Sequence, residues 1–193
     1  MCSSDLDRSG FVLGEGAAAL ILESEAAALA RGATILAVIT GYGNTTDASH
    51  IAQPDAAGQA RAMRLALADA GLEPGDIGYL NAHGTGTKVG DLSETLAIKQ
   101  VFGSHARALP VSATKALHGH LMGATGAVEM VVALAALRSG TLPPTAHLRV
   151  PDPECDLDYI TEGARQVSGL AHVMSNSFGF GGSNAVIVAS RVG

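Results

Sequence analysis

The sequence has little charge, few aromatic side chains, two cysteines and no tryptophan. Charged residues make up 16% of its 193 residues and aromatic residues 4%, whereas hydrophobic residues make up 47%. So apolar a composition predicts buried strands in a sheet that helices cover on both faces. The length predicts one domain with a complete core.

These scarcities exclude several classes of protein. Acidic residues outnumber basic ones by 18 to 12, and nucleic-acid phosphates need a basic face, so we expect no nucleic-acid partner. Cys2 and Cys155 are too few for a disulfide framework, which predicts a reducing, cytoplasmic compartment. The chain does not open with a signal-peptide pattern. The stretch "AVEMVVALAAL" contains Glu129 and is shorter than the roughly 20 residues of a membrane span, so we expect no membrane association.

Strand-like and helix-like segments alternate along the chain. Apolar, β-branched runs predict strands at 16–23, 33–43, 77–83 and 108–114, and a closing hairpin around "GFGG". Apolar spacing predicts a helix over 54–71 that stops at Gly71. Asp91 and Glu94 resemble a capping box at the start of a helix to about Phe102. A third helix is predicted from His120 to Ser139, and the alternation indicates a layered α/β domain.

The first candidate site is "NAHGTGTKVGD". His83 ends a predicted strand and enters a loop in which Gly84 and Gly86 allow close approach of a ligand. Thr85 and Thr87 add hydroxyl groups. The alternative is a satisfied histidine in a tight turn. The glycine spacing fits neither a dinucleotide fingerprint nor a phosphate loop.

The second candidate is "TKALHGHLMGATGAVE". It places Lys115, His118 and His120 within six residues, directly before an apolar helix that contains Glu129. A buried lysine needs a counter-charge, and Glu129 is the nearest carboxylate on the apolar face. His118 and His120 alternate in a segment predicted to be non-helical, which favours opposite directions for their rings. A metal site made with His83 lacks a carboxylate or thiolate at ligand spacing, so we expect no metal.

The third candidate is "NSFGFGGSN", which includes Phe178, Gly179, Phe180 and Gly181. Such a loop can present backbone N–H groups to a developing oxyanion. It can equally be a tight hairpin turn, and the residues alone leave both interpretations open.

Together these stretches resemble the β-ketoacyl-[acyl-carrier-protein] synthases, most closely the type II elongating condensing enzymes. The matching motifs run in family order: "DRSGFVLGEGA", "GYGNTTDASH", "NAHGTGT", "VSATKALHGHLMGATGAVE", "TLPPTAHLRVPDPECDLDY", "ARQVSG" and "NSFGFGGSN". The resemblance implies that residues 1–193 are the C-terminal half of a thiolase-like fold. That half is expected to be a layered α/β/α domain with a mixed five-stranded sheet.

The resemblance also implies roles for individual residues. His83 and His120 match the histidines that stabilise the enolate formed when malonyl-carrier protein loses CO₂. Lys115 and Glu129 match an ion pair that holds the site, and Phe180 matches a gating residue at an oxyanion hole. The expected substrate-binding residues are Thr85, Thr87, Phe178, Gly179 and Gly181. Arg8 matches a residue of the carrier-protein docking surface, and His118 has no implied role.

The implied reaction joins an acyl-enzyme to malonyl-carrier protein in fatty acid elongation. The implied partners are the acyl and malonyl carrier proteins and a second copy of the protein in a homodimer. No cofactor is implied, because phosphopantetheine on the carrier holds the substrates. The alternatives are a type II polyketide ketosynthase, a non-condensing subunit like a chain-length factor, a carrier-binding module and, less well matched, a thiolase.

The family nucleophile is a cysteine that precedes the "DRSGF" stretch. Five residues separate Cys2 from Arg8, too few for the strand and helix that hold such a cysteine, so Cys2 is not assigned. Cys155 lies in a connector and is expected to be structural. Residues 1–6 are interpreted as foreign to the domain. We expect the 193-residue chain alone to be inactive and poorly soluble.

Overall fold

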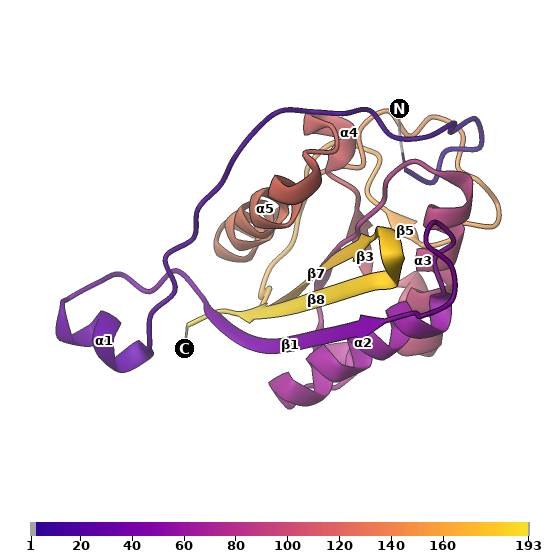
Figure 1. The fold of residues 1–193 in the computed structure, drawn as a ribbon. Helices are drawn as coiled ribbons and strands as arrows, with labels where there is room; N and C mark the ends of the chain where they lie inside the picture. Colours follow the sequence, from indigo (N-terminus) through magenta and orange to yellow (C-terminus); the bar gives the residue numbers. More distant parts are fainter. Residues whose placement is uncertain (1–2, 193) are drawn as a thin grey trace.

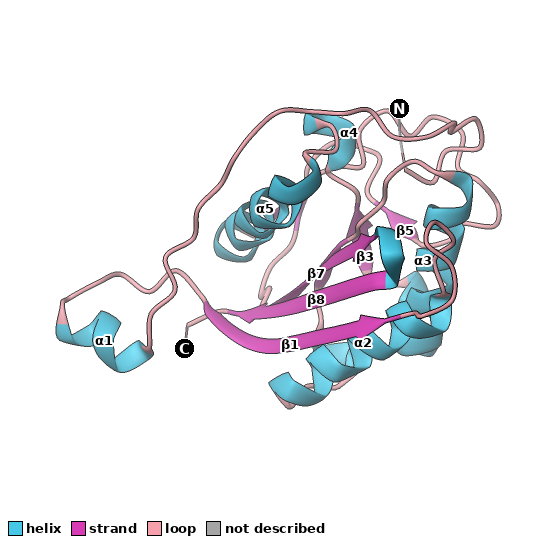
Figure 2. Cartoon of the chain, viewed as in Figure 1, coloured by secondary structure: helices cyan, strands magenta, loops and turns pink. Residues whose placement is uncertain are grey.

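A computed structural model describes residues 3–192 and folds them around a mixed six-stranded sheet (Figures 1 and 2). The strand order is β1-β8-β7-β2-β3-β5. Strand β8 is antiparallel to β1 and β7, whereas β7, β2, β3 and β5 run parallel. The strands are β1 (Val38–Thr46), β2 (Tyr79–Asn81), β3 (Pro110–Ser112), β5 (Asp158–Tyr159), β7 (His172–Gly179) and β8 (Ser183–Ser190). The layered α/β fold with a mixed sheet is confirmed, and two-residue β5 adds a sixth strand to the five expected.

Helices cover both faces of this sheet (Figure 1). Helices α2 (Ala56–Ala70) and α3 (Lys88–Phe102) pack on one face, and α5 (Thr125–Ser139) packs on the other. Helices α1 (Glu25–Ala30) and α4 (Lys115–His118) are short. Strands β4 (Thr141–Leu142) and β6 (Arg165–Gln166) form a separate antiparallel pair. The 3₁₀ turns are η1 (Pro74–Asp76), η2 (Gly103–Arg107), η3 (Met122–Ala124) and η4 (Phe180–Gly182).

Helix α2 packs directly against β1. The Asp55 carboxylate caps the helix by accepting from the Ala57 N–H at 3.0 Å, and Gly71 ends it with φ +66°. A Cβ on Gly41 would lie 2.1 Å from the Ala66 carbonyl oxygen, so only glycine permits this packing. The helix predicted over 54–71 is confirmed, together with its glycine stop.

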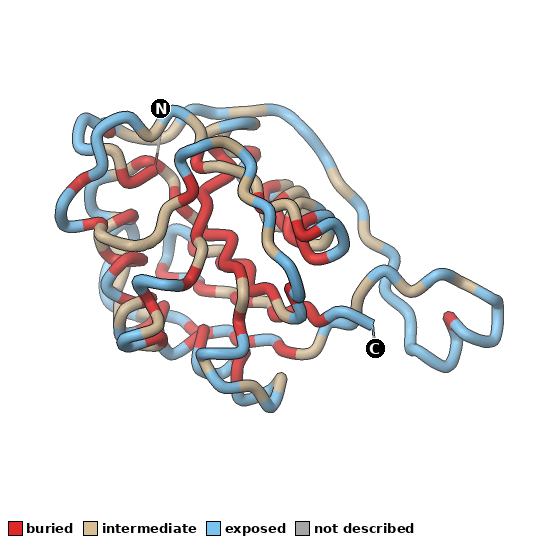
Figure 3. Tube along the Cα trace, turned by 180° about the vertical axis from the view of Figure 1, so that it is seen from behind, coloured by how far each residue is buried: buried red, intermediate tan, exposed pale blue. Residues whose placement is uncertain are grey.

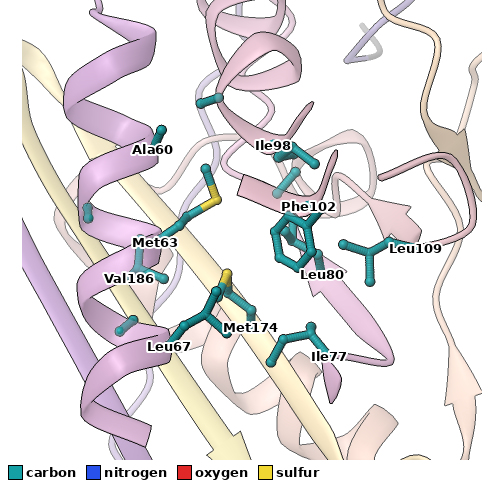
Figure 4. Close-up of a cluster of buried hydrophobic side chains, with 14 of the residues drawn as sticks. Ala60, Met63, Leu67, Ile77, Leu80, Ile98, Phe102, Leu109, Met174 and Val186 are labelled. Atoms are coloured by element: carbon teal, nitrogen blue, oxygen red, sulfur yellow. The ribbon is translucent and has the colours of Figure 1, made fainter. Parts of the chain in front are cut away.

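The larger hydrophobic core lies between the sheet and α2 with α3 (Figure 4). Side chains from both helices interdigitate with side chains from β2, β3, β7 and β8 and from the loops beside them. The labelled members are Ala60, Met63, Leu67, Ile77, Leu80, Ile98, Phe102, Leu109, Met174 and Val186. Burying these side chains is the main favourable contribution to folding, and the core holds the sheet end that carries the first candidate site.

The strand predicted at 16–23 does not form. Those residues belong to a largely exposed segment, residues 15–37, whose part around α1 projects away from the rest of the domain (Figures 1 and 3). Ile21 and Leu22 are 82% and 75% exposed. The pattern suits a strand, but within residues 3–192 no strand lies beside it to complete its hydrogen bonds. The next predicted strand, 33–43, is displaced and appears as β1.

The apolar segment around α5 is longer than the sequence suggested. The η3 turn leads directly into α5. Together they make one helical stretch, Met122–Ser139, with the length and composition that a membrane span requires. Core helices of soluble proteins pass the same test, so one such stretch is weak evidence. Glu129, in its middle, is fully buried and ion-paired, which is typical of a helix packed inside a protein.

Candidate active site

A cavity of about 710 Å³ lies where the three candidate motifs meet. Its wall comes from the loop after β2, the segment between α4 and α5, the β7–β8 connection and residues 47–54. Loops at strand ends are where sites gather in α/β folds. The cavity lining includes seven of the residues expected from the sequence: His83, Thr85, Thr87, His120, Phe178, Gly179 and Phe180.

His83 and His120 lie next to each other on this wall, with their rings edge to face. Their ring centroids are 5.6 Å apart, with an angle of 83° between the rings. Nδ1 of His120 accepts from the Met122 N–H at 3.2 Å and lies 2.9 Å from the Thr125 hydroxyl. An accepting Nδ1 places the proton of the neutral ring on Nε2. His120 is therefore oriented as an Nε2–H donor.

Both rings are held in the neutral form. Burial lowers the pKa of His83 well below its usual value, and the positive charge of Lys115 lowers it further, as does the repulsion that a protonated His83 would meet from a protonated His120. Burial, Lys115 and His118 lower the pKa of His120 in the same direction. Phe178 lies 5.9 Å from His83 and Phe11 lies 5.4 Å from His120, measured between ring centroids. The aromatic surroundings and the nearby lysine together favour two neutral imidazoles at neutral pH.

Lys115 and Glu129 form a buried ion pair beside the histidines. Lys115 Nζ lies 2.6 Å from Glu129 Oε1 and also donates to the backbone carbonyl of His83. Burial raises the pKa of Glu129 to about 7, against the opposing effect of Lys115. The sequence-based pairing is thus present in the structure, with Lys115 reaching from α4 to α5 and to the loop after β2.

Asp91 and Glu94 hold the His83 loop rather than capping a helix. Helix α3 begins earlier than predicted, with Thr87 as its N-cap. The Glu94 carboxylate accepts from the backbone N–H groups of His83 at 2.9 Å and Gly84 at 2.8 Å. Asp91 accepts from the Gly86 N–H at 3.1 Å. Burial raises the pKa of both acids, that of Asp91 to about 6. Sequence reasoning missed this role.

The threonine pair and the phenylalanine loop complete the cavity wall. The hydroxyls of Thr85 and Thr87 lie 3.0 Å apart. Phe180 is 69% exposed, and Phe178 and Gly179 also line the cavity. Gly181 departs from expectation: it does not line the cavity, and its N–H donates to the carbonyl of Ile51 at 2.8 Å.

Asp47 joins the phenylalanine loop to the start of α2. Its N–H donates to the Gly182 carbonyl at 2.9 Å. Its carboxylate accepts from the Asn184 side chain at 2.6 Å and from the Asp55 N–H at 3.0 Å. The position of the Phe180 loop is therefore tied to a helix that packs in the main core.

Arg8 does not lie on an exposed docking surface. The residue is 4% exposed. Its guanidinium pairs with Asp152 at 2.6 Å and with Asp91 at 3.3 Å. An acidic carrier protein cannot reach a guanidinium that these buried carboxylates already occupy, so the docking prediction for Arg8 is wrong.

The remaining candidates lie away from the cavity. His118 ends α4 in a helical turn, not in the non-helical segment expected, and bonds to its neighbours Gly119 and Thr114. Cys155 is a buried free thiol whose pKa is raised by burial. Cys2 lies outside the described residues. Within residues 3–192 no group of three or more His, Cys, Asp or Glu side chains is placed to hold a metal ion.

Ser4 and Asp5 pack into the domain. The Ser4 N–H donates to the Asp91 carboxylate at 2.8 Å, and Asp5 accepts from the backbone N–H groups of Arg149 and Val150. The prediction that residues 1–6 are foreign to the domain concerns their origin, and it stays a prediction.

Comparison with known proteins identifies the family. Residues 36–149 match the family model "Beta-ketoacyl synthase, C-terminal domain". The chain belongs to the β-ketoacyl synthase family. It is 52% identical over 183 residues to 3-oxoacyl-[acyl-carrier-protein] synthase 2 of Staphylococcus aureus, covering 94% of this chain and 45% of that protein. It is 51% identical over 185 residues to nodulation protein E of Rhizobium meliloti, covering 96% of this chain and 46% of that protein.

Solved ketosynthase structures share the fold. A β-ketoacyl synthase from Burkholderia phymatum STM815 superimposes with a TM-score of 0.96 at 44% identity, covering 100% of this chain and 47% of that one. A type II polyketide ketosynthase, solved in complex with its acyl-carrier protein, gives 0.94 at 36% identity, covering 100% and 47%. The thiolase-like fold is therefore confirmed. The chain spans about half the length of the curated relatives it matches.

Proposed function

We propose that this chain is the catalytic C-terminal domain of a 3-oxoacyl-[acyl-carrier-protein] synthase that elongates fatty acyl chains. The observation that carries the proposal is the pair of neutral imidazoles, 5.6 Å apart on the wall of one cavity. The substrate would be a malonyl thioester on the phosphopantetheine arm of a carrier protein. The family identity and the 52% identity to a synthase of this name support it.

The chemistry follows from what two neutral N–H donors can do. When the bond between the malonyl α-carbon and its carboxylate breaks, CO₂ leaves and the electron pair remains on the substrate. Negative charge then develops on the thioester oxygen as an enolate. His83 and His120 would stabilise that oxygen by hydrogen bonds. A protonated imidazole pair would repel itself, so the lowered pKa values suit this role.

The carbon–carbon bond forms when the enolate carbon attacks an acyl thioester and displaces the thiolate that carried it. That thiolate belongs to the cysteine that first takes up the acyl group. We propose that this cysteine lies in the N-terminal part of the full-length enzyme, because neither Cys155 nor Cys2 is assigned that role. Thr85 and Thr87 would bind the prosthetic arm, and Phe180 would gate the acyl site. Lys115 and Glu129 would hold His83 in place.

The proposed partners and location follow the family. A similar ketosynthase binds an acyl-carrier protein, which supports a carrier protein as the partner here, and we extend the proposal to a cytoplasmic homodimer without a cofactor of its own. The presence of His83, Lys115 and His120 in one site favours a condensing enzyme over a non-condensing partner subunit.

The test is condensation by the purified full-length enzyme. Supplied with acyl- and malonyl-carrier protein, it should release CO₂ and form 3-oxoacyl-carrier protein in equal amounts. Mass spectrometry of the carrier-bound product would measure both the new chain and its length. Carrier binding without CO₂ release would show a non-condensing subunit and refute the proposal.

A further inference from the structure

Arg8 contacts the backbone of the loop that carries the two threonines. Its Nη2 donates to the Lys88 carbonyl at 3.1 Å, and its Nε lies 3.4 Å from the Thr87 carbonyl. Its Nη1 donates to the Asp5 carbonyl at 2.8 Å and to the Asp152 carboxylate at 2.6 Å. A buried arginine with this many directed bonds is fixed in one orientation, because its planar fork allows few others.

The same loop is held from its other side by Asp91. Asp91 accepts from the Gly86 N–H at 3.1 Å and pairs with Nε of Arg8 at 3.3 Å. Arg8 therefore binds carbonyl oxygens of the loop while its own counter-ion binds an amide of the loop. Thr85 and Thr87 lie within this clamped segment and line the cavity.

We propose that Arg8 is a positioning residue for the substrate-binding loop: it fixes the backbone at residues 86–88 so that the Thr85 and Thr87 hydroxyls meet the thioester-bearing arm of the substrate. The proposal rests on the proposed function, since it assigns the threonines to that arm. Arg8 itself touches no substrate.

The discriminating variant is Arg8→Lys in the full-length enzyme. A lysine keeps the positive charge near Asp152 but cannot reach three carbonyls and two carboxylates at once. Initial rates should be measured with malonyl-carrier protein and with malonyl-pantetheine, which has no protein to dock, each at low and high ionic strength. We expect KM to rise about 10-fold on both substrates at both salt concentrations, with kcat within about twofold, because hydrogen bonds to a charged group are lost from substrate positioning.

Arg165→Lys is the matched control. Arg165 also pairs with two carboxylates, those of Asp158 and Glu162, but it lies outside the cavity lining. This variant should keep the wild-type KM on both substrates. Were it to raise KM as much as Arg8→Lys, a general effect of losing a guanidinium would explain the result and the proposal would fall.

Three results would overturn the positioning role. A KM increase confined to the carrier-linked substrate and abolished by salt would indicate docking. An unchanged KM, or a loss of kcat alone, would contradict it directly.

Were Arg8→Lys unable to fold, Asp152→Asn would serve instead, since it loosens the guanidinium while leaving it present. A smaller KM increase on both substrates supports the proposal, and an unchanged KM refutes it. A wild-type enzyme that turns over neither substrate refutes the proposed function and this inference together.

Discussion

Lys115 and Glu129 form an ion pair of 2.6 Å, with 4% and 0% of their side-chain surfaces exposed. Lys115 also donates to the carbonyl of His83, so the pair connects α4, α5 and the strand end that carries the first histidine. Glu129 Oε2 has no hydrogen-bond partner within residues 3–192. The carboxylate thus depends on Lys115 for its charge compensation.

Breaking this pair from either side should destabilise the protein strongly. Lys115→Met leaves a buried carboxylate without a partner, and Glu129→Leu leaves a buried ammonium. Each should lower the free energy of unfolding by about 3–5 kcal/mol. The double variant should lose less than the sum, because neither charge remains, and urea unfolding of all four proteins measures the coupling. Additive losses would show that the two side chains do not interact.

The two cavity histidines should be needed for decarboxylation. His83→Ala and His120→Ala should each lower CO₂ release from malonyl-carrier protein by about 10²–10³-fold, since each removes one donor to the enolate oxygen. His118→Ala is the matched control, because His118 lies two residues from His120 but does not line the cavity. Its CO₂ release should stay within a few-fold of wild type. Equal losses in all three variants would refute the assignment.

Elements with local start and stop signals could be predicted from the sequence. Gly71 and Gly140 adopt the left-handed conformation at the ends of α2 and α5, as their positions after apolar helices suggest. The closing hairpin and the Lys115–Glu129 pair were also predictable. In each case the deciding residues are neighbours in the chain or belong to one recognised motif.

Features that depend on distant partners could not be predicted from residue patterns. The 16–23 segment has a strand pattern, but a strand also needs a neighbour, which no local pattern reveals. Asp91 and Glu94 look like capping residues because they lie near a helix start. Only the folded chain shows that they accept from the loop at residues 83–86. The docking role expected for Arg8 comes from the family resemblance, and the sequence carries no signal that Arg8 is buried against Asp152, 144 residues away.

Glu94 should act on the site through the backbone. Glu94→Gln replaces one accepting oxygen with an N–H₂ group that faces the N–H of His83 or Gly84. We expect a loss of about 1–3 kcal/mol in unfolding free energy, as for an unsatisfied buried donor, and slower CO₂ release because His83 shifts. Thermal unfolding and CO₂ release measure the two effects. Glu154→Gln, on the surface, should change neither, and a Glu94→Gln protein as stable as wild type would contradict the proposed support.

The lowered pKa of His83 makes stability depend on pH. Its usual value is 6.5, so below that pH the unfolded chain binds a proton that the folded chain does not. The stabilising contribution is therefore complete above about pH 6.5 and is lost as pH falls. Urea unfolding between pH 7.5 and about 5 should show wild type losing more stability than His83→Gln, by at most about 1.4 kcal/mol per pH unit. Asp91 and Glu129, whose pKa values are raised, occur in both proteins and largely cancel in the difference. Parallel pH curves would contradict a His83 that stays neutral in the folded protein.

Gly182 should be more sensitive to substitution than its neighbour Gly181, although both have positive φ, +77° and +79°. A Cβ on Gly182 would lie 2.8 Å from Asp47 Cβ and 3.0 Å from Asp47 N, whereas a Cβ on Gly181 meets no atom within 4 Å. Both alanine variants should lose about 1 kcal/mol from the backbone conformation. Gly182→Ala should lose about 1–3 kcal/mol more from overpacking, and it should raise KM because Asp47 can no longer hold the Phe180 loop.

Thermal unfolding and condensation kinetics of the two variants, compared side by side, test this. Equal losses in both would mean that contact with Asp47 does not position the loop.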